Sequence, residues 1–441
     1  MPAIAAGFLL FVAFLLGGAS REHELRVALV ELAALPLLLV ATTILIRRRE
    51  PSRLAIACVG AIVAIPILQL IPLPPAVWSS LPGREQSVLA LEVVGEPLGW
   101  MPLTLTPDRT WRSLLALIPP IAMFLGVLVV TGQNHLRLFH GLMAITAAAI
   151  IVGVVQLASG GNQFYPWRTT DWPSVVGLFA NRNHLATLCL ISIPVTFAIG
   201  SRQLRRAPFA LPREFWLSAV LLALIVVALG AIRSRTGVIL VGPALAASAV
   251  SGWIATGRGW PKPVFLGILA SATAALTIVA AFALGPILAR FDTAGMREGR
   301  FENWPLIMDA SANYLPVGSG IGSFDPVFRS VEPLENLLPT FFNQAHNEYL
   351  EVWLETGWLG IGALALFAVW FGQRSWAAWR AQPNTERDLQ RASSIAIVLV
   401  LFHSVVDYPL RTLTLSVVFA LCCATLEMAG RRSPSARGRR R

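Results

Sequence analysis

Runs of apolar residues, each about as long as a lipid bilayer is thick, recur along this 441-residue chain. A helix needs roughly 20 such residues to cross the hydrocarbon core of a membrane. Only 13% of the residues are charged, whereas about a quarter are charged in an ordinary soluble protein. The charged residues also fall in short clusters between the apolar runs. These features predict an all-α integral membrane protein that crosses the bilayer many times.

The apolar runs predict twelve transmembrane helices, with a retained first span and not a cleaved signal peptide. The spans are expected at about residues 3–19, 27–46, 54–73, 113–131, 138–158, 184–200, 214–232, 236–256, 263–285, 352–372, 392–407 and 412–429. Alternating them divides the connections into two sets, and most Lys and Arg residues fall in the set that contains 47–53, 201–213 and the C-terminal tail. Because basic loops stay in the cytoplasm, both termini are predicted to be cytoplasmic. The basic tail is interpreted as a topology signal and a contact for anionic membrane lipids, with no nucleic acid as a partner.

Five regions follow from this division. They are residues 1–158, N-terminal membrane helices with an outward loop at 74–112; 159–285, central helices; 286–351, a large outward loop between helices 9 and 10; 352–430, C-terminal helices; and 431–441, the basic tail. The large loop is the largest piece outside the membrane. Chemistry that takes place in water is therefore expected beneath it.

Several arginines stand at the outward ends of the spans or in the large loop, namely Arg182, Arg233, Arg235, Arg297 and Arg300. A single arginine at a membrane interface is commonly a snorkelling side chain. Several on the outward side favour anion binding instead, because basic residues are ordinarily placed in the inward loops. The guanidinium fork matches two phosphate oxygens, which suits a lipid diphosphate head group.

The stretch HNEYLEVWLETGWLG, residues 346–360, places a histidine and three acids where a span begins. Glu348, Glu351 and Glu355 share one helix face, and acids in the first turns of a helix interact favourably with its dipole. This interaction with the helix dipole would by itself account for the three acids. Histidine can transfer a proton near neutral pH, and a neighbouring carboxylate can orient it. His346 is therefore a candidate catalytic base, with a structural hydrogen bond as the alternative.

Short polar residues accompany these groups at the outward span ends. For Asn183 and Asp407, helix capping is the simplest interpretation. Together with Asn347 and Glu351 they are also candidates for supporting His346. The glycines of GSGIGSF, residues 318–324, are expected to form a tight turn, because the sequence lacks the lysine of a nucleotide-binding phosphate loop.

Neither a metal nor another cofactor is expected. HNE lacks the second histidine of a zinc-binding HExxH helix and the cysteine pair of a zinc deaminase. The four cysteines lie in apolar segments without metal-ligand spacing and are predicted to be small, unbridged residues of the spans; they are Cys58, Cys189, Cys422 and Cys423.

The order of the outward motifs carries a family resemblance. The motifs are Phe179 to His184, Ser234–Arg235, Arg300 to Trp304, Gly320 to Gly322 and His346 to Gly360. In this order they resemble the O-antigen ligase and O-antigen polymerase superfamily of bacterial membrane glycan transferases. The resemblance covers roughly residues 170–411, whereas the first 160 residues are similar only in being hydrophobic.

This resemblance implies a metal-independent, inverting glycosyltransferase of the GT-C-like membrane type in the bacterial inner membrane, with its active site facing the periplasm. The donor would be a glycan on a polyprenyl (undecaprenyl) diphosphate carrier. Arg235 and Arg300, with Arg182 beside them, would hold the diphosphate, and His346 would act on the acceptor hydroxyl.

The acceptor is left open by the sequence. Lipid A–core would make the protein a ligase in lipopolysaccharide biosynthesis, and a growing glycan chain would make it a polysaccharide polymerase, as in exopolysaccharide biosynthesis. A protein acceptor is a third possibility. The alternatives to a transferase are a transporter or flippase of lipid-linked saccharides, which needs polar groups near mid-membrane, and a non-catalytic scaffold of an envelope assembly complex.

Overall fold

The computed structural model describes residues 1–19, 23–48, 51–160, 163–167, 174–206, 213–256, 299–334 and 342–429. Its first half contains helices α1 (Pro2–Leu16), α2 (Glu24–Arg48), α3 (Arg53–Leu70), α4 (Pro75–Trp78), α5 (Glu85–Val94), α6 (Pro107–Leu115), α7 (Ile118–Val129) and α8 (Asn134–Ser159), with strands β1 (Pro72–Leu73) and β2 (Met101–Pro102). The second half contains α9 (Arg182–Arg206), α10 (Arg213–Ile232), α11 (Arg235–Thr256), α14 (Gly299–Ala312), α15 (Phe324–Val331), α16 (Glu348–Arg380), α17 (Thr385–His403), the 3₁₀ helix η3 (Pro409–Arg411) and α18 (Leu413–Glu427).

The helical character of the chain confirms the predicted class. Among the described residues, eight helical segments are long and apolar enough to cross a membrane: α2, α3, α6 with α7, α8, α9, α10, α11 and α16. Helices α1 and α18 are apolar but shorter. The span predicted at 263–285 lies outside the described residues, so the count of twelve stays a prediction.

One predicted span is divided in two. The run 113–131 is formed by the end of α6 and the whole of α7, which are joined through Ala116 and Leu117. Pro119 and Pro120 have no amide hydrogen with which to continue the hydrogen bonds of α6. They fit at the start of α7, where the amides of a helix have no partner within it.

Hydrogen bonds between residues at helix ends show that the helix termini gather at two opposite ends of the bundle. At one end, the amide of Thr414 donates to the carbonyl of Gly17, and that of Ala180 donates to Gly18. At the other end, Ser52 bonds to the carboxylate of Glu427. We call the first the site end. This grouping is what alternating the predicted spans requires, although which end faces the cytoplasm stays a prediction.

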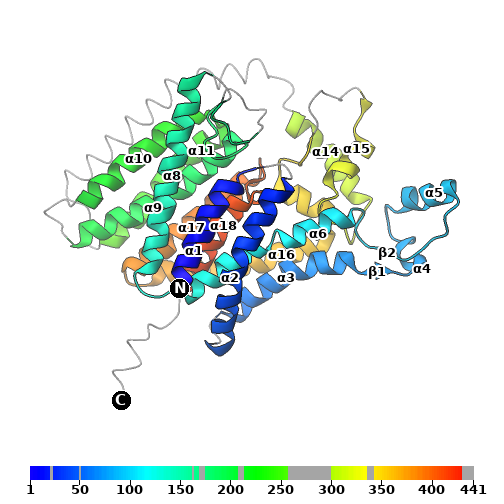
Figure 1. Ribbon diagram of the computed structural model, residues 1–441, viewed down its shortest axis with the longest axis horizontal. Coiled ribbons are helices and arrows are strands. Elements are labelled where there is room, and N and C mark those ends of the chain that lie inside the picture. Colours follow the sequence, from blue (N-terminus) through cyan, green and yellow to red (C-terminus); the bar gives the residue numbers. More distant parts are fainter. Residues whose placement is uncertain are drawn as a thin grey trace.

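Helix α9 lies at the centre of one half of the bundle, packed against α10, α11 and α17. Its apolar part is buried throughout. Figure 1 shows α8 to α11 on one side of the bundle, with α14 and α15 near the site end. The four cysteines are unbridged and buried, as predicted. The central position of α9 means that its first residues are held in the middle of the site end.

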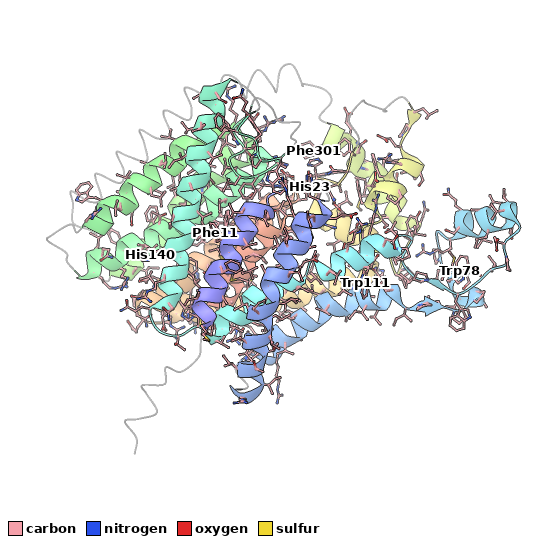
Figure 2. The ribbon with its side chains drawn as sticks, in the orientation of Figure 1. Phe11, His23, Trp78, Trp111, His140 and Phe301 are labelled. Atoms are coloured by element: carbon pink, nitrogen blue, oxygen red, sulfur yellow. The ribbon has the colours of Figure 1, made fainter. Side chains whose placement is uncertain are left out.

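The loop between α3 and α6 projects from the bundle, and its buried Trp78 lies far from the other labelled side chains in Figure 2. Its two-stranded antiparallel sheet pairs Pro72 with Pro102. The loop returns to the bundle next to the glycine-rich turn at 318–322. There the amide of Leu105 donates to the carbonyl of Ser319 at 2.9 Å. The N-terminal region therefore contacts a segment that the sequence predicted to lie in the large outward loop.

Candidate active site

His346 lies immediately before α16, in a backbone conformation that few residues adopt. Its φ is 49°, whereas positive φ is uncommon outside glycine. The next residue, Asn347, is the N-cap of α16, and its side-chain oxygen accepts hydrogen bonds from the amides of Tyr349 and Leu350, both at 3.1 Å. Asn347 therefore acts as a helix cap. It fixes the point at which the chain turns and thus the position of the histidine.

The carboxylate of Asp407 joins His346 to α9. Nδ1 of His346 lies 3.3 Å from Oδ1 of Asp407, and Nδ2 of Asn183 donates to the other oxygen at 2.5 Å. The Asp407 side chain is only 1% exposed, and that of His346 is 15% exposed. Donation from Nδ1–H to the carboxylate leaves Nε2 of His346 as the nitrogen that can accept a proton. Three predicted residues that are far apart in sequence are thus brought together.

Aromatic rings enclose this histidine. The ring of Tyr408 lies 4.8 Å from that of His346, and the ring of Phe342 lies 5.8 Å from it, both in edge-to-face arrangements. Such packing restricts the orientation of an imidazole. The side chain is therefore held both by a carboxylate and by its neighbours.

The three glutamates at the start of α16 are buried and make specific bonds. Glu348 accepts a hydrogen bond from the hydroxyl of Ser404 at 2.6 Å and one from the amide of Leu410 at 2.7 Å. Glu351 accepts one from the amide of Ala345 at 3.1 Å. Electrostatics at the helix start is therefore only part of their role. They hold the residue before His346 and the hairpin that carries Asp407.

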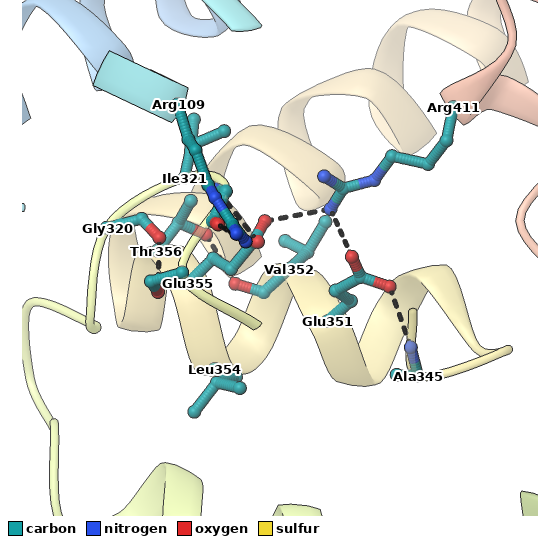
Figure 3. A network of polar contacts seen from close by, with 12 residues as sticks. Arg109, Gly320, Ile321, Ala345, Glu351, Val352, Leu354, Glu355, Thr356 and Arg411 are labelled. Carbon is teal, nitrogen blue, oxygen red and sulfur yellow. Dashed lines mark hydrogen bonds and ion pairs between the residues drawn. The ribbon is translucent and has the colours of Figure 1, made fainter. Parts of the chain in front are cut away.

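Arg411 lies between two of these glutamates, as Figure 3 shows. Its Nη2 is 2.8 Å from Oε2 of Glu355 and 3.3 Å from Oε1 of Glu351. Burial alone would lower the pKa of Arg411, but the two carboxylates outweigh it and raise this pKa above its ordinary value. The guanidinium therefore stays charged and cross-links η3 to α16. Sequence reasoning assigned no role to Arg411, whose one signal was its place in an outward hairpin with Asp407.

The glycine-rich turn docks onto a break in α16. Gly357 has non-helical dihedral angles, φ 55° and ψ −139°, inside this helix. The carbonyls of Leu354 and Glu355 accept from the amides of Ser319 and Gly320 instead, at 3.0 and 2.9 Å. The amide of Trp358 in turn donates to the carbonyl of Pro316. A segment of the loop thus takes the place of the helix's own hydrogen-bond partners.

Side chains also hold this turn. The carboxylate of Glu355 accepts a hydrogen bond from the amide of Gly322 at 2.9 Å. Gln69, buried at the end of α3, donates to the carbonyl of Glu355 and accepts from the amide of Ile321. Positive φ at Gly318, Gly320 and Gly322 confirms the predicted turn. Sequence reasoning missed Gln69, whose signal was a polar residue within an apolar run.

The candidate diphosphate-binding arginines are placed only in part. Arg182 begins α9, beside Asn183, and its Nη1 donates to the hydroxyl of Ser174 at 3.2 Å. Arg235 begins α11, which packs closely against α9 near Ala186. Arg300 lies in the first turn of α14, and its side chain lies outside the described residues. The first two thus stand at neighbouring helix starts at the site end.

A family model described as O-antigen ligase matches residues 217–365. The resemblance to the O-antigen ligase family is confirmed. The matched region extends from α10 into α16 and contains Arg235, Arg300 and His346, whereas Asn183 and Asp407 lie outside it. No curated protein matched the chain.

The O-antigen ligase family match supports glycan transfer of the O-antigen ligase or polymerase type by a multi-pass membrane protein. The family implies a lipid-linked glycan and an acceptor glycan as the substrates.

Proposed function

We propose that this protein transfers a glycan from an undecaprenyl diphosphate carrier to an acceptor hydroxyl on the periplasmic side of the inner membrane. The observation that carries the proposal is the arrangement of His346 and Asp407. The partly exposed imidazole of His346 is held by the buried carboxylate of Asp407. His346 lies within the region that matches the O-antigen ligase family, and Asp407 lies after it. A histidine oriented by a third group is the usual arrangement of a general base.

The acceptor hydroxyl is a poor nucleophile until it loses its proton. Nε2 of His346 accepts that proton while the oxygen attacks the anomeric carbon, and the bond from this carbon to the diphosphate breaks. General base catalysis of this kind contributes roughly 10²–10⁴-fold to a rate. Attack opposite the leaving group inverts the anomeric configuration.

The departing diphosphate gains negative charge. Arg182 and Arg235, at the adjoining starts of α9 and α11, and Arg300 at the start of α14 would stabilise that charge. Preorganised cations of this kind stabilise a transition state without reorganisation. Their charges supply the neutralisation for which many phosphate-transfer enzymes use a metal ion, which supports metal-independent transfer.

The proposal is tested with purified protein in liposomes, given an undecaprenyl-diphosphate-linked repeat unit and products resolved by size. A ladder of longer lipid-linked glycans identifies a polymerase. Single-step transfer that needs added lipid A–core identifies a ligase, and transfer only to a protein identifies an oligosaccharyltransferase.

The variant His346→Ala is expected to lose transfer by at least 100-fold and to keep its binding of the donor. Its matched control is His140→Ala, since His140 is an exposed histidine of α8 (Figure 2). Activity near that of the wild type in His346→Ala would overturn the proposal.

A further inference from the structure

A cavity of about 380 Å³ lies at the site end, between the end of α1, the start of α2, α6 and the turn near Gly322. Small-molecule sites commonly measure about 300–1,000 Å³. His23, labelled in Figure 2, is one of its lining residues. His346, Arg182 and Arg235 are not among them. The cavity is therefore separate from the part of the proposed diphosphate site that Arg182 and Arg235 form.

The cavity adjoins the catalytic segment. Asn343 and Gln344, which line it, come directly before Ala345 and His346. Glu351 also lines the cavity, and its carboxylate holds the amide of Ala345 (Figure 3). A ligand in the cavity would thus lie against the residues that position His346.

The charge of the lining does not suit a diphosphate. Each lining arginine is paired with a carboxylate: Arg411 with Glu351 and Glu355, Arg109 with Asp325 at 3.1 Å, and Arg112 with Glu24 at 2.7 Å. Counting Glu31, the described residues that line the cavity include five carboxylates and three guanidinium groups. Because the lining arginines are already paired with carboxylates, none of these described residues offers a free positive charge that would attract a phosphate, whereas carboxylates and amides accept hydrogen bonds from hydroxyl groups. The lining therefore suits a neutral, hydroxyl-rich ligand.

One lining atom lacks a partner. Oε1 of Gln344 is buried and accepts no hydrogen bond from the described part of the chain. A buried acceptor without a partner destabilises the folded chain, because it has lost its hydrogen bond to water and gained none in exchange. A ligand hydroxyl donating to this amide oxygen would remove that destabilisation.

The walls are held in place without a ligand. The hydroxyl of Thr110 in α6 donates to the carbonyl of Ile321 at 2.7 Å, and Arg109, the preceding residue, donates to the carboxylate of Asp325 in α15. Apolar side chains such as Leu16 and Phe324 complete the lining. A preformed cavity binds with little loss of conformational entropy.

We propose that this cavity binds a neutral sugar residue of the acceptor glycan, next to the sugar whose hydroxyl reacts at His346. The inference rests on the proposed function for the identity of the ligand as an acceptor. It assigns a role to α1, α2 and α6, which lie in the first 160 residues, where the sequence contains no recognisable motif.

The test uses variants that fill the cavity from two different elements, Ala28→Trp in α2 and Ala116→Phe directly after α6, both at lining positions. The matched control is Leu32→Trp, also in α2, where the side chain is 60% exposed. Two probes are titrated into each purified protein. One is the acceptor glycan freed of lipid and phosphate, and the other is undecaprenyl diphosphate without sugar.

Both filling variants are expected to bind the free glycan at least tenfold more weakly than the wild type and the control, with binding of undecaprenyl diphosphate unchanged. Glycan binding at the wild-type level in both variants, absence of glycan binding by the wild type, or loss of undecaprenyl diphosphate binding instead would each overturn the inference.

A competition arm separates acceptor from donor sugars. Undecaprenyl diphosphate carrying the repeat unit should bind together with the free glycan, and displacement of the glycan by it would assign the cavity to the donor. The proposed function fails separately, through absence of transfer in liposomes, whatever these titrations show.

Discussion

His346 has a strained backbone conformation, and its side chain is held next to a carboxylate. Its positive φ directs the imidazole away from α16 and toward Asp407, 61 positions along the chain. The histidine itself could be singled out from the sequence, because its residue type and its place before a span suggest proton transfer. Its partner could be proposed only as one polar residue among several, since sequence separation does not reveal contact.

Replacing His346 separates the backbone strain from the chemistry. Asparagine tolerates positive φ, so His346→Asn should lose transfer while its stability stays within about 0.5 kcal/mol of the wild type. A β-branched residue resists this conformation, and His346→Val should lose a further ~1–2 kcal/mol. Denaturation in detergent measures the difference. Equal stability of the two variants would show that this backbone conformation is unimportant.

Arg411 is the residue whose role could least be predicted from the sequence. The chain is rich in arginine, so one more at a span end carried no signal. Only the fold places it against Glu351 and Glu355. The glutamates themselves were interpretable as helix-start acids because three of them share one helix face.

Removing the charge of Arg411 should be costly. Arg411→Met leaves two buried carboxylates without their cation, a type of change that costs about 3–5 kcal/mol. Because the pKa of Arg411 is raised in the folded protein, the contribution of its own ionisation is fully present below the ordinary arginine pKa and is lost only as the pH rises through the raised pKa. Thermal unfolding measures the loss of stability in Arg411→Met. The control is Glu31→Gln, because Glu31 lines the same cavity as Arg411. A loss below about 1 kcal/mol would contradict the pairing.

At the scale of elements, the break in α16 and the glycine-rich turn form one unit. The sequence predicted the span and the turn separately, from hydropathy and from glycine content. Their docking depends on Gly357, which interrupts α16 and frees the carbonyls that the turn then occupies. A glycine inside an apolar run does not reveal such a break, because glycine is common in transmembrane helices.

Two glycines with positive φ provide a matched pair for testing this unit. A Cβ at Gly320, where φ is 106°, would collide with Thr104, whereas a Cβ at Gly95, where φ is 73°, would meet nothing within 4 Å. Gly95→Ala should cost only the backbone strain of about 1–2 kcal/mol. Gly320→Ala should cost more and should also impair transfer, because the turn borders the site. Equal losses of stability, with transfer intact, would show that the turn is not docked as described.

Across the whole molecule, alternating the apolar runs predicted which helix ends gather together. Residues near 17, 180, 346 and 412 meet at the site end, and those near 52 and 427 meet at the other. Hydropathy gives this order because each span reverses the chain. It gives no lateral neighbours, so the central position of α9 and the cavity beneath α1, α2 and α6 could not be predicted.

The orientation of the bundle can be measured with introduced cysteines. Ser80 and Gln382 are exposed residues of connections predicted to be outward and inward, and the four native cysteines are buried. In intact spheroplasts, an impermeant maleimide should label Ser80→Cys, and it should label Gln382→Cys only after permeabilisation. The reverse pattern would place the site end in the cytoplasm.

His346 and Asp407 are proposed to act as one catalytic unit, and a double-mutant cycle on the transfer rate measures whether they do. Asp407→Asn is expected to slow transfer in the wild-type background by at least tenfold, because the carboxylate orients the base. In the His346→Ala background the same change should have no further effect, since residues that act together do not contribute additively. An equal loss in both backgrounds would show that Asp407 acts independently of the histidine and would contradict the account.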